Sequence, residues 1–163
     1  MLKKTQAVVP HEARDAARAA RAAALALLAR RDYGTAELRA ALRARSFEEA
    51  VLEELLAALT RERVLDDARF ADNYVGYHAG RGQGPLRIAA DLRQRGLGEA
   101  LIESALARES DWTGLARKAR RAKFGAQEPR SWPERAKQAR FLQYRGFSSD
   151  HIRAATGADP ELD

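Results

Sequence analysis

The chain contains no cysteine, which excludes both a disulfide framework and a metal site built on thiolate ligands. No apolar run approaches the roughly 20 residues that a transmembrane helix requires. The opening segment, MLKKTQAVVP, includes no apolar stretch of the kind found in a signal peptide. From these absences we expect a cytoplasmic protein that does not enter a membrane.

β-Branched residues are also few, whereas alanine, leucine, arginine and glutamate dominate the 163 residues. This composition is typical of an all-helical protein. A chain of this length is able to form one ordinary core or three helical modules of about fifty residues each. The choice between them depends on whether the sequence repeats.

Three segments of the chain align at a constant offset of fifty residues. The first contains Leu38, Leu42, Arg45, Ser46, Phe47 and Leu52; the second contains Ile88, Leu92, Arg95, Gly96, Leu97 and Ile102; the third contains Gln138, Leu142, Arg145, Gly146, Phe147 and Ile152. A unit this small cannot bury its apolar face alone, so its repetition predicts an elongated array of stacked neighbours. Such an array offers a long surface to a partner.

Each repeat is predicted to contain three helices, because its apolar residues follow helical spacing. The predicted boundaries are residues 12–62, 63–109 and 110–157, followed by a flexible acidic tail at 158–163. In the first repeat we predict a helix over 12–31 and a helix cap at Thr35. Ser46 and Glu49 have the spacing of a capping box, which predicts a third helix over 47–60.

Proline, glycine and capping residues mark the helix ends of the other two repeats. Pro85 is predicted to begin a helix, where its missing N–H costs little, and Gly96 to end it. Ser131 and Glu134 again have capping-box spacing, and Gly146 is predicted to close the helix that they open.

The positive charge of the chain is concentrated in one segment. The chain has 29 basic and 23 acidic residues, a formal net charge of +6. Residues 1–70 hold 13 basic and 11 acidic residues, and residues 71–109 hold five of each. Between Glu109 and Phe147 there are three acidic residues and ten basic ones: Arg117, Lys118, Arg120, Arg121, Lys123, Arg130, Arg135, Lys137, Arg140 and Arg145. Solvated helix faces normally mix both signs, so this segment predicts an exposed surface for an anionic partner.

Three aromatic residues, Trp132, Phe141 and Tyr144, lie in the same basic segment. Phe141 and Tyr144 share the spacing of the apolar positions of their predicted helix. We therefore predict that these aromatic side chains pack in a core.

A glycine-rich loop at Gly80, Gly82 and Gly84 has some likeness to a phosphate-binding loop. It follows a helix instead of a strand, and it lacks the Lys-Ser/Thr pair of a nucleotide-binding loop. We predict that this loop is a hinge or spacer.

No residue pattern indicates catalysis. His11, His78 and His151 fall in three different repeats and lack metal-ligand spacing. The adjacent Asp66 and Asp67 diverge by about 100° on a helix, and a helix cap accounts for both. We therefore expect no metal, no cofactor and no enzymatic activity.

Four segments together resemble the RecX family of bacterial recombination regulators. VLDDARFADNYV (64–75) and RGQGPLRIAADLRQRGL (81–97) resemble the central signature of that family, KQARFLQYRGFSSDHI (137–152) its C-terminal repeat, and ELRAALRARSF (37–47) its N-terminal repeat. The likeness spans residues 12 to 155 and keeps the order of the repeats. Ser46 stands where the family tends to carry glycine, and Ala90 where it often carries an acidic residue.

The resemblance implies an all-α fold of three tandem three-helix repeats in an elongated, curved array. It also implies binding to the RecA recombinase filament on single-stranded DNA, with inhibition of filament growth, ATP hydrolysis and strand exchange. We expect a monomer whose surface toward the filament or DNA includes Arg81, Arg87, Arg93, Arg95, Arg117, Lys118, Arg120, Arg121, Lys123, Arg135, Lys137, Arg140 and Arg145.

Two alternatives remain open at this stage. Three-helix units are close in shape to helix-turn-helix modules, so the chain is also consistent with a stand-alone protein that binds DNA without reading its sequence. The second alternative is a scaffold for another acidic protein. Salt dependence separates phosphate binding from a shape-matched protein interface.

Overall fold

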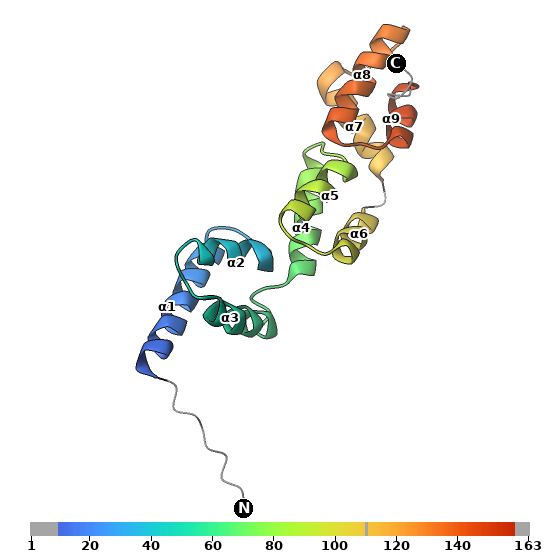
Figure 1. Ribbon diagram of the computed structural model, residues 1–163. Coiled ribbons are helices and arrows are strands. Elements are labelled where there is room, and N and C mark those ends of the chain that lie inside the picture. Colours follow the sequence, from blue (N-terminus) through green and yellow to red (C-terminus); the bar gives the residue numbers. More distant parts are fainter. Residues whose placement is uncertain (1–9, 110, 159–163) are drawn as a thin grey trace, which may run out of the picture. The chain divides into compact units, whose positions relative to one another are not determined.

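A computed structural model describes residues 10–109 and 111–158, and all regular secondary structure in these ranges is helical. Within these described ranges, nine α-helices follow one another in groups of three (Figure 1). The prediction of an all-α fold built from three-helix repeats is confirmed. The chain divides after Asp66 into two compact units, which are described separately.

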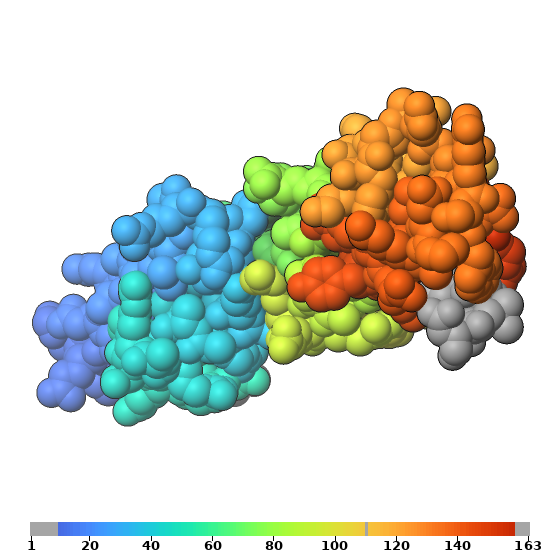
Figure 2. All heavy atoms as spheres, turned by 90° about the horizontal axis from the view of Figure 1, so that it is seen from above, coloured from blue at the N-terminus to red at the C-terminus, as the bar shows by residue number. Residues whose placement is uncertain are grey.

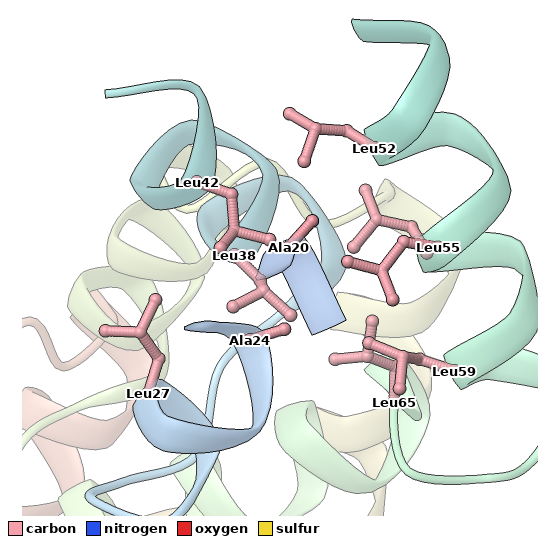
Figure 3. Close-up of a cluster of buried hydrophobic side chains, with 10 residues drawn as sticks. Ala20, Ala24, Leu27, Leu38, Leu42, Leu52, Leu55, Leu59 and Leu65 are labelled. Atoms are coloured by element: carbon pink, nitrogen blue, oxygen red, sulfur yellow. The ribbon is translucent and has the colours of Figure 1, made fainter. Parts of the chain in front are cut away.

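The first unit contains one three-helix group. Its helices are α1 (His11–Leu28), α2 (Thr35–Arg43) and α3 (Glu49–Arg61). Figure 3 shows Leu52, Leu55 and Leu59 of α3 pointing toward the small side chains of α1. Ala20 and Ala24 of α1 are fully buried, so the helices approach closely there. Each leucine that this core removes from water contributes about 2 kcal/mol to folding.

The second unit contains the other two groups. Its helices are α4 (Asp67–Gly80), α5 (Pro85–Gln94), α6 (Glu99–Arg108), α7 (Trp112–Phe124), α8 (Trp132–Arg145) and α9 (Ser149–Thr156). One core is centred on Ile88, Leu92 and Ile102, and the other includes Leu142 and Phe147. Trp112 and Leu115 at the start of α7 pack against both cores, so the two groups share an apolar junction.

Backbone hydrogen bonds also join these two groups. The N–H of Gly84 donates to the carbonyl of Arg145 at 2.8 Å, and the N–H of Leu86 donates to the carbonyl of Gly146 at 2.9 Å. The yellow-green atoms of α5 lie against the orange-red atoms at the end of α8 in Figure 2. A Cβ atom on Gly84 would lie 2.2 Å from the carbonyl carbon of Gly146. The prediction that this glycine loop is a hinge or spacer is therefore wrong: it is a tightly packed joint.

Most of the helix-end signals in the second unit are confirmed. Pro85 lies in the first turn of α5, and Gly96, just after that helix, has a φ of +84°. Ser131 and Glu134 form the predicted capping box at the start of α8, and Gly146 ends that helix with a φ of +94°. A left-handed backbone is easy for glycine because it lacks a Cβ.

The helix ends of the first unit differ from the prediction. Helix α1 ends at Leu28 instead of residue 31, and Thr35 is the first residue of α2 instead of its cap. Ser46 does not cap α3, which begins at Glu49. Its φ of +68° shows that Ser46 occupies the left-handed position that Gly96 and Gly146 occupy in the other repeats. The fifty-residue alignment, more than the capping-box pattern, identifies its role.

Two of the three aromatic residues predicted for the core are exposed. The exposed fraction is 76% for Tyr144 and 50% for Trp132. Phe141 is half-buried and packs against the third core, in edge contact with the ring of Phe124. Ala158, which was predicted to begin a flexible tail, is buried against the same core; the rest of that predicted tail, 159–163, lies outside the described residues.

Candidate anion-binding surface

Helix α7 carries the densest part of the basic segment, five cations within seven residues. Arg117, Lys118, Arg121 and Lys123 are exposed. Helix α8 supplies the half-buried Arg135 and the exposed Lys137. Within the part of the chain that the structure describes, none of these side chains has a carboxylate within ion-pair distance.

Arg120 is not part of this exposed surface, contrary to the sequence prediction. Its exposed fraction is 3%. The Nη1 of Arg120 donates to the backbone carbonyl of Gln127 at 3.0 Å and to Oε1 of Gln138 at 3.3 Å. Arg120 therefore ties the segment after α7 to α8. Its position on α7 faces α8, and only the long guanidinium-tipped side chain reaches both acceptors.

Three other predicted cations have structural partners of their own. Arg117 donates from Nη2 to the carbonyl of Ala154 at 3.3 Å, and Arg135 donates to the carbonyl of Pro129. Arg93 forms an ion pair with Glu99, and this hydrogen bond holds the pKa of Glu99 below its ordinary value. An anion that binds Arg93 would have to compete with Glu99.

Four cations meet around one pocket of the second unit. The pocket has a volume of about 320 Å³, and its basic lining residues are Arg81, Lys118, Lys123 and Arg145. Its remaining lining side chains are apolar or glycine, and they include Leu115, Ala119, Ala122 and Phe141. A cleft that carries charge of one sign between apolar walls concentrates its electric field. We call this site the cationic pocket.

Arg145 is held in place at the edge of this pocket. Its guanidinium lies 5.5 Å from the ring centre of Phe141, a cation–π contact. The Nε–H of Arg145 is buried and has no hydrogen-bond partner among the described residues. Gly82 borders the pocket with a φ of +84°, a left-handed backbone that favours glycine, whereas a Cβ there would make only ordinary van der Waals contacts, 3.7 Å from Nη2 of Arg145 and 3.5 Å from the Cβ of Ala119.

Tyrosine rings lie beside arginines on the same unit. The guanidinium of Arg81 lies 4.8 Å from the ring centre of Tyr77, and that of Arg87 lies 5.7 Å from the ring centre of Tyr144. Tyr77 is 58% exposed. Sequence reasoning missed both tyrosines as surface residues. The four-residue spacing of Tyr77 and Arg81 was a usable signal, whereas the pairing of Arg87 with Tyr144 depends on tertiary contacts.

The described residues contain no cluster of three or more His, Asp or Glu side chains able to hold a metal ion, and no helix there is long and apolar enough to cross a membrane. His78 and His151 are half-buried, and desolvation lowers the pKa of each imidazole. These histidines are therefore neutral near neutral pH. They add no charge to the basic surface.

Family models for three RecX domains match most of the chain. The model of the first three-helix domain matches residues 20–59, that of the second matches 66–106, and that of the third matches 109–156. The chain belongs to the RecX family. Its regulatory character follows from relatives that carry the name regulatory protein RecX.

One such RecX relative, from Halorhodospira halophila, is 44% identical over 153 residues, which cover 93% of this chain and 95% of the relative. Another relative, from Pseudomonas fluorescens, is 45% identical over 144 residues, which cover 86% of this chain and 92% of that relative. The crystal structure of RecX from Lactobacillus salivarius matches this chain with a TM-score of 0.76 at 22% sequence identity. The match covers 86% of this chain and 94% of the chain in that structure. That structural match supports the fold.

Proposed function

We propose that the chain binds the RecA recombinase filament on single-stranded DNA and restrains filament growth, ATP hydrolysis and strand exchange. The observation that carries this proposal is the match of all three RecX domain models, in order, along one chain. The family resemblance supplies the partner and the inhibitory effect. On this proposal the protein acts by binding and needs no catalytic residue.

The charge distribution of the second unit supports an anionic partner. A recombinase filament on DNA presents phosphate groups and acidic side chains, and the exposed cations of α7 have no carboxylate partner within the described ranges. Because these cations are not already neutralised, they are available for an intermolecular contact. On the sequence prediction alone, the proposed surface also includes Arg87, Arg95 and Arg140.

Steady-state ATP hydrolysis by RecA on single-stranded DNA tests the proposal. Increasing concentrations of the wild-type chain should lower the hydrolysis rate. Reversing two exposed cations of α7, Arg117→Glu with Arg121→Glu, should weaken this inhibition, whereas reversing Arg14 and Arg18 on α1 makes the same charge change and serves as the control. Arg120 is left unchanged because it is buried. A wild-type chain that leaves the rate unchanged at every concentration contradicts the proposal.

A second candidate function is sequence-independent DNA binding without a recombinase. The exposed cations of α7, which have no carboxylate partner within the described ranges, favour it, since phosphate contacts alone give such binding. For single strands the slope of log affinity against log salt is about −0.7 per neutralised phosphate. Inhibition that loses affinity as steeply with salt as binding to naked DNA does supports this second candidate, and inhibition that is less sensitive supports a recombinase interface.

A further inference from the structure

We propose that the cationic pocket is the site where single-stranded nucleic acid contacts this chain, with one backbone phosphate in the pocket and a neighbouring base on the ring of Tyr77. This inference deepens the proposed function, on which it rests, by assigning the nucleic-acid contact to one site. The basic residues outside the pocket then contact the recombinase instead of the nucleic acid.

The pocket has the chemistry of a phosphate site. Four cations from three places in the sequence converge on it, namely Arg81 after α4, Lys118 and Lys123 on α7, and Arg145 at the end of α8. Among the described residues, none with a carboxylate lines it. Arginine donates two parallel hydrogen bonds to a phosphate, and lysine adds a mobile point charge. Apolar walls of low dielectric strengthen these interactions by focusing the electric field of the cations.

The pocket is also organised before a ligand arrives. Its walls come from both three-helix groups of the second unit, and the Gly84–Arg145 and Leu86–Gly146 backbone hydrogen bonds hold those groups together. Phe141 positions the guanidinium of Arg145 from one side. The Nε–H of Arg145 has no hydrogen-bond partner among the described residues, so no hydrogen bond has to be broken at that atom when an anion binds. Less ordering is then needed on binding, which favours affinity.

A single strand suits this site better than a duplex. The pocket is bounded by residues of α4, the loop after it, α7 and α8. A flexible strand is able to bend so that one phosphate reaches into a pocket of this kind, whereas duplex DNA is stiff, with a persistence length of about 150 base pairs. At the rim, Arg81 joins the pocket to Tyr77, whose ring is 58% exposed. An exposed aromatic ring beside a phosphate-binding cation is typical of single-strand binding, because every base is able to stack on it.

Fluorescence anisotropy with a labelled oligothymidylate of about twenty nucleotides tests the proposal on the full chain without recombinase. Neutralising two pocket cations, Lys118→Gln with Lys123→Gln, should weaken binding at least about tenfold and reduce the salt slope by about 0.7. The control, Arg14→Gln with Arg18→Gln on α1, removes the same charge from exposed positions outside the basic surface and should change affinity less than about twofold. Equal losses in the two double variants overturn the proposal in favour of a diffuse basic surface.

A second pair of variants tests whether a base stacks on Tyr77. Tyr77→Ala should weaken binding about tenfold, and Tyr144→Ala, which removes an exposed ring outside the pocket, should not. A duplex of the same length that binds as tightly as the single strand overturns the assignment to single strands.

A measurement on the wild-type chain keeps the test independent of folding in the variants. In nuclear magnetic resonance spectra, adding the oligothymidylate should shift the amide signal of Gly82 and the Nε–H signal of Arg145. Shifts confined to signals of the first unit overturn the proposal. RecA is absent from these experiments, so failure of the proposed function, seen as unchanged ATP hydrolysis with wild-type chain, is a separate result.

Discussion

Replacement of the buried Arg120 by glutamate should destabilise the second unit strongly. Arg120 is 3% exposed and donates to the carbonyl of Gln127 and to Oε1 of Gln138. Both partners are hydrogen-bond acceptors. A glutamate carboxylate at this position would face them with no donor, and two hydrogen bonds from a charged donor would be lost.

The expected magnitude follows from those contacts. Each hydrogen bond to a charged group contributes about 1.5–3 kcal/mol, and leaving a buried charge unpaired costs about 3–5 kcal/mol. We therefore expect Arg120→Glu to lower the free energy of unfolding by at least about 3 kcal/mol. The adjacent Arg121 is exposed, so Arg121→Glu makes the same charge change and should alter stability by about 0.5 kcal/mol or less.

Urea denaturation followed by circular dichroism measures both variants. The two compact units are allowed separate transitions in the fit, and the effect of Arg120→Glu should appear in the transition of the second unit. If Arg120→Glu and Arg121→Glu unfold at the same urea concentration as the wild-type chain, the structural role assigned to Arg120 is refuted.

Three further predictions concern the joint, a helix cap and pH. Gly84→Ala should lower the free energy of unfolding by about 2–4 kcal/mol, because the new Cβ would lie 2.2 Å from the backbone of Gly146 and would disrupt the joint. Gly76→Ala, which has open space around it, should stabilise α4 by up to about 1 kcal/mol. Thermal unfolding measures both variants, and melting temperatures that shift in the same direction would contradict this. Ser131→Ala should cost about 1 kcal/mol through loss of the capping box of α8, measured by urea denaturation, and an unchanged midpoint would argue against it. Burial lowers the pKa of His78 and His151. Their contribution to stability is therefore present above the ordinary histidine pKa of about 6.5 and is lost as the pH falls below it. A melting temperature that increases when the pH is lowered from about 7 to 5.5 would be inconsistent with this assignment.

The sequence predicted the features of the fold that local chemistry determines. The repeat at an offset of fifty residues places Gly96 and Gly146 where each helix must end in a left-handed turn. The same alignment places Ser46 there, yet the capping-box spacing favoured a different role for it. A side-chain pattern of four residues is weaker information than a backbone position that recurs three times.

The candidate site was less predictable because it depends on tertiary contacts. Helical spacing alone does not distinguish Arg120, which faces α8, from Arg121, which faces solvent. Tyr144 occupies an apolar spacing position but is exposed. The cationic pocket joins Arg81 to Arg145 across two repeats, and no local pattern relates residues so distant in the sequence. The glycine-rich sequence indicated a special loop at residues 80–84. Its role as a packed joint became visible only from the contact of Gly84 with Gly146 in the structure.

Binding of the labelled chain to RecA filaments tests most directly the proposal that the chain regulates that recombinase. Filaments are assembled on single-stranded DNA with enough RecA to cover the strand, and the chain is titrated against these filaments, against the naked strand and against RecA without DNA at roughly 0.2 M salt, where simple phosphate binding is weak. The account predicts that the filament binds the chain more tightly than either component alone. Equal or tighter binding to the naked strand would contradict it.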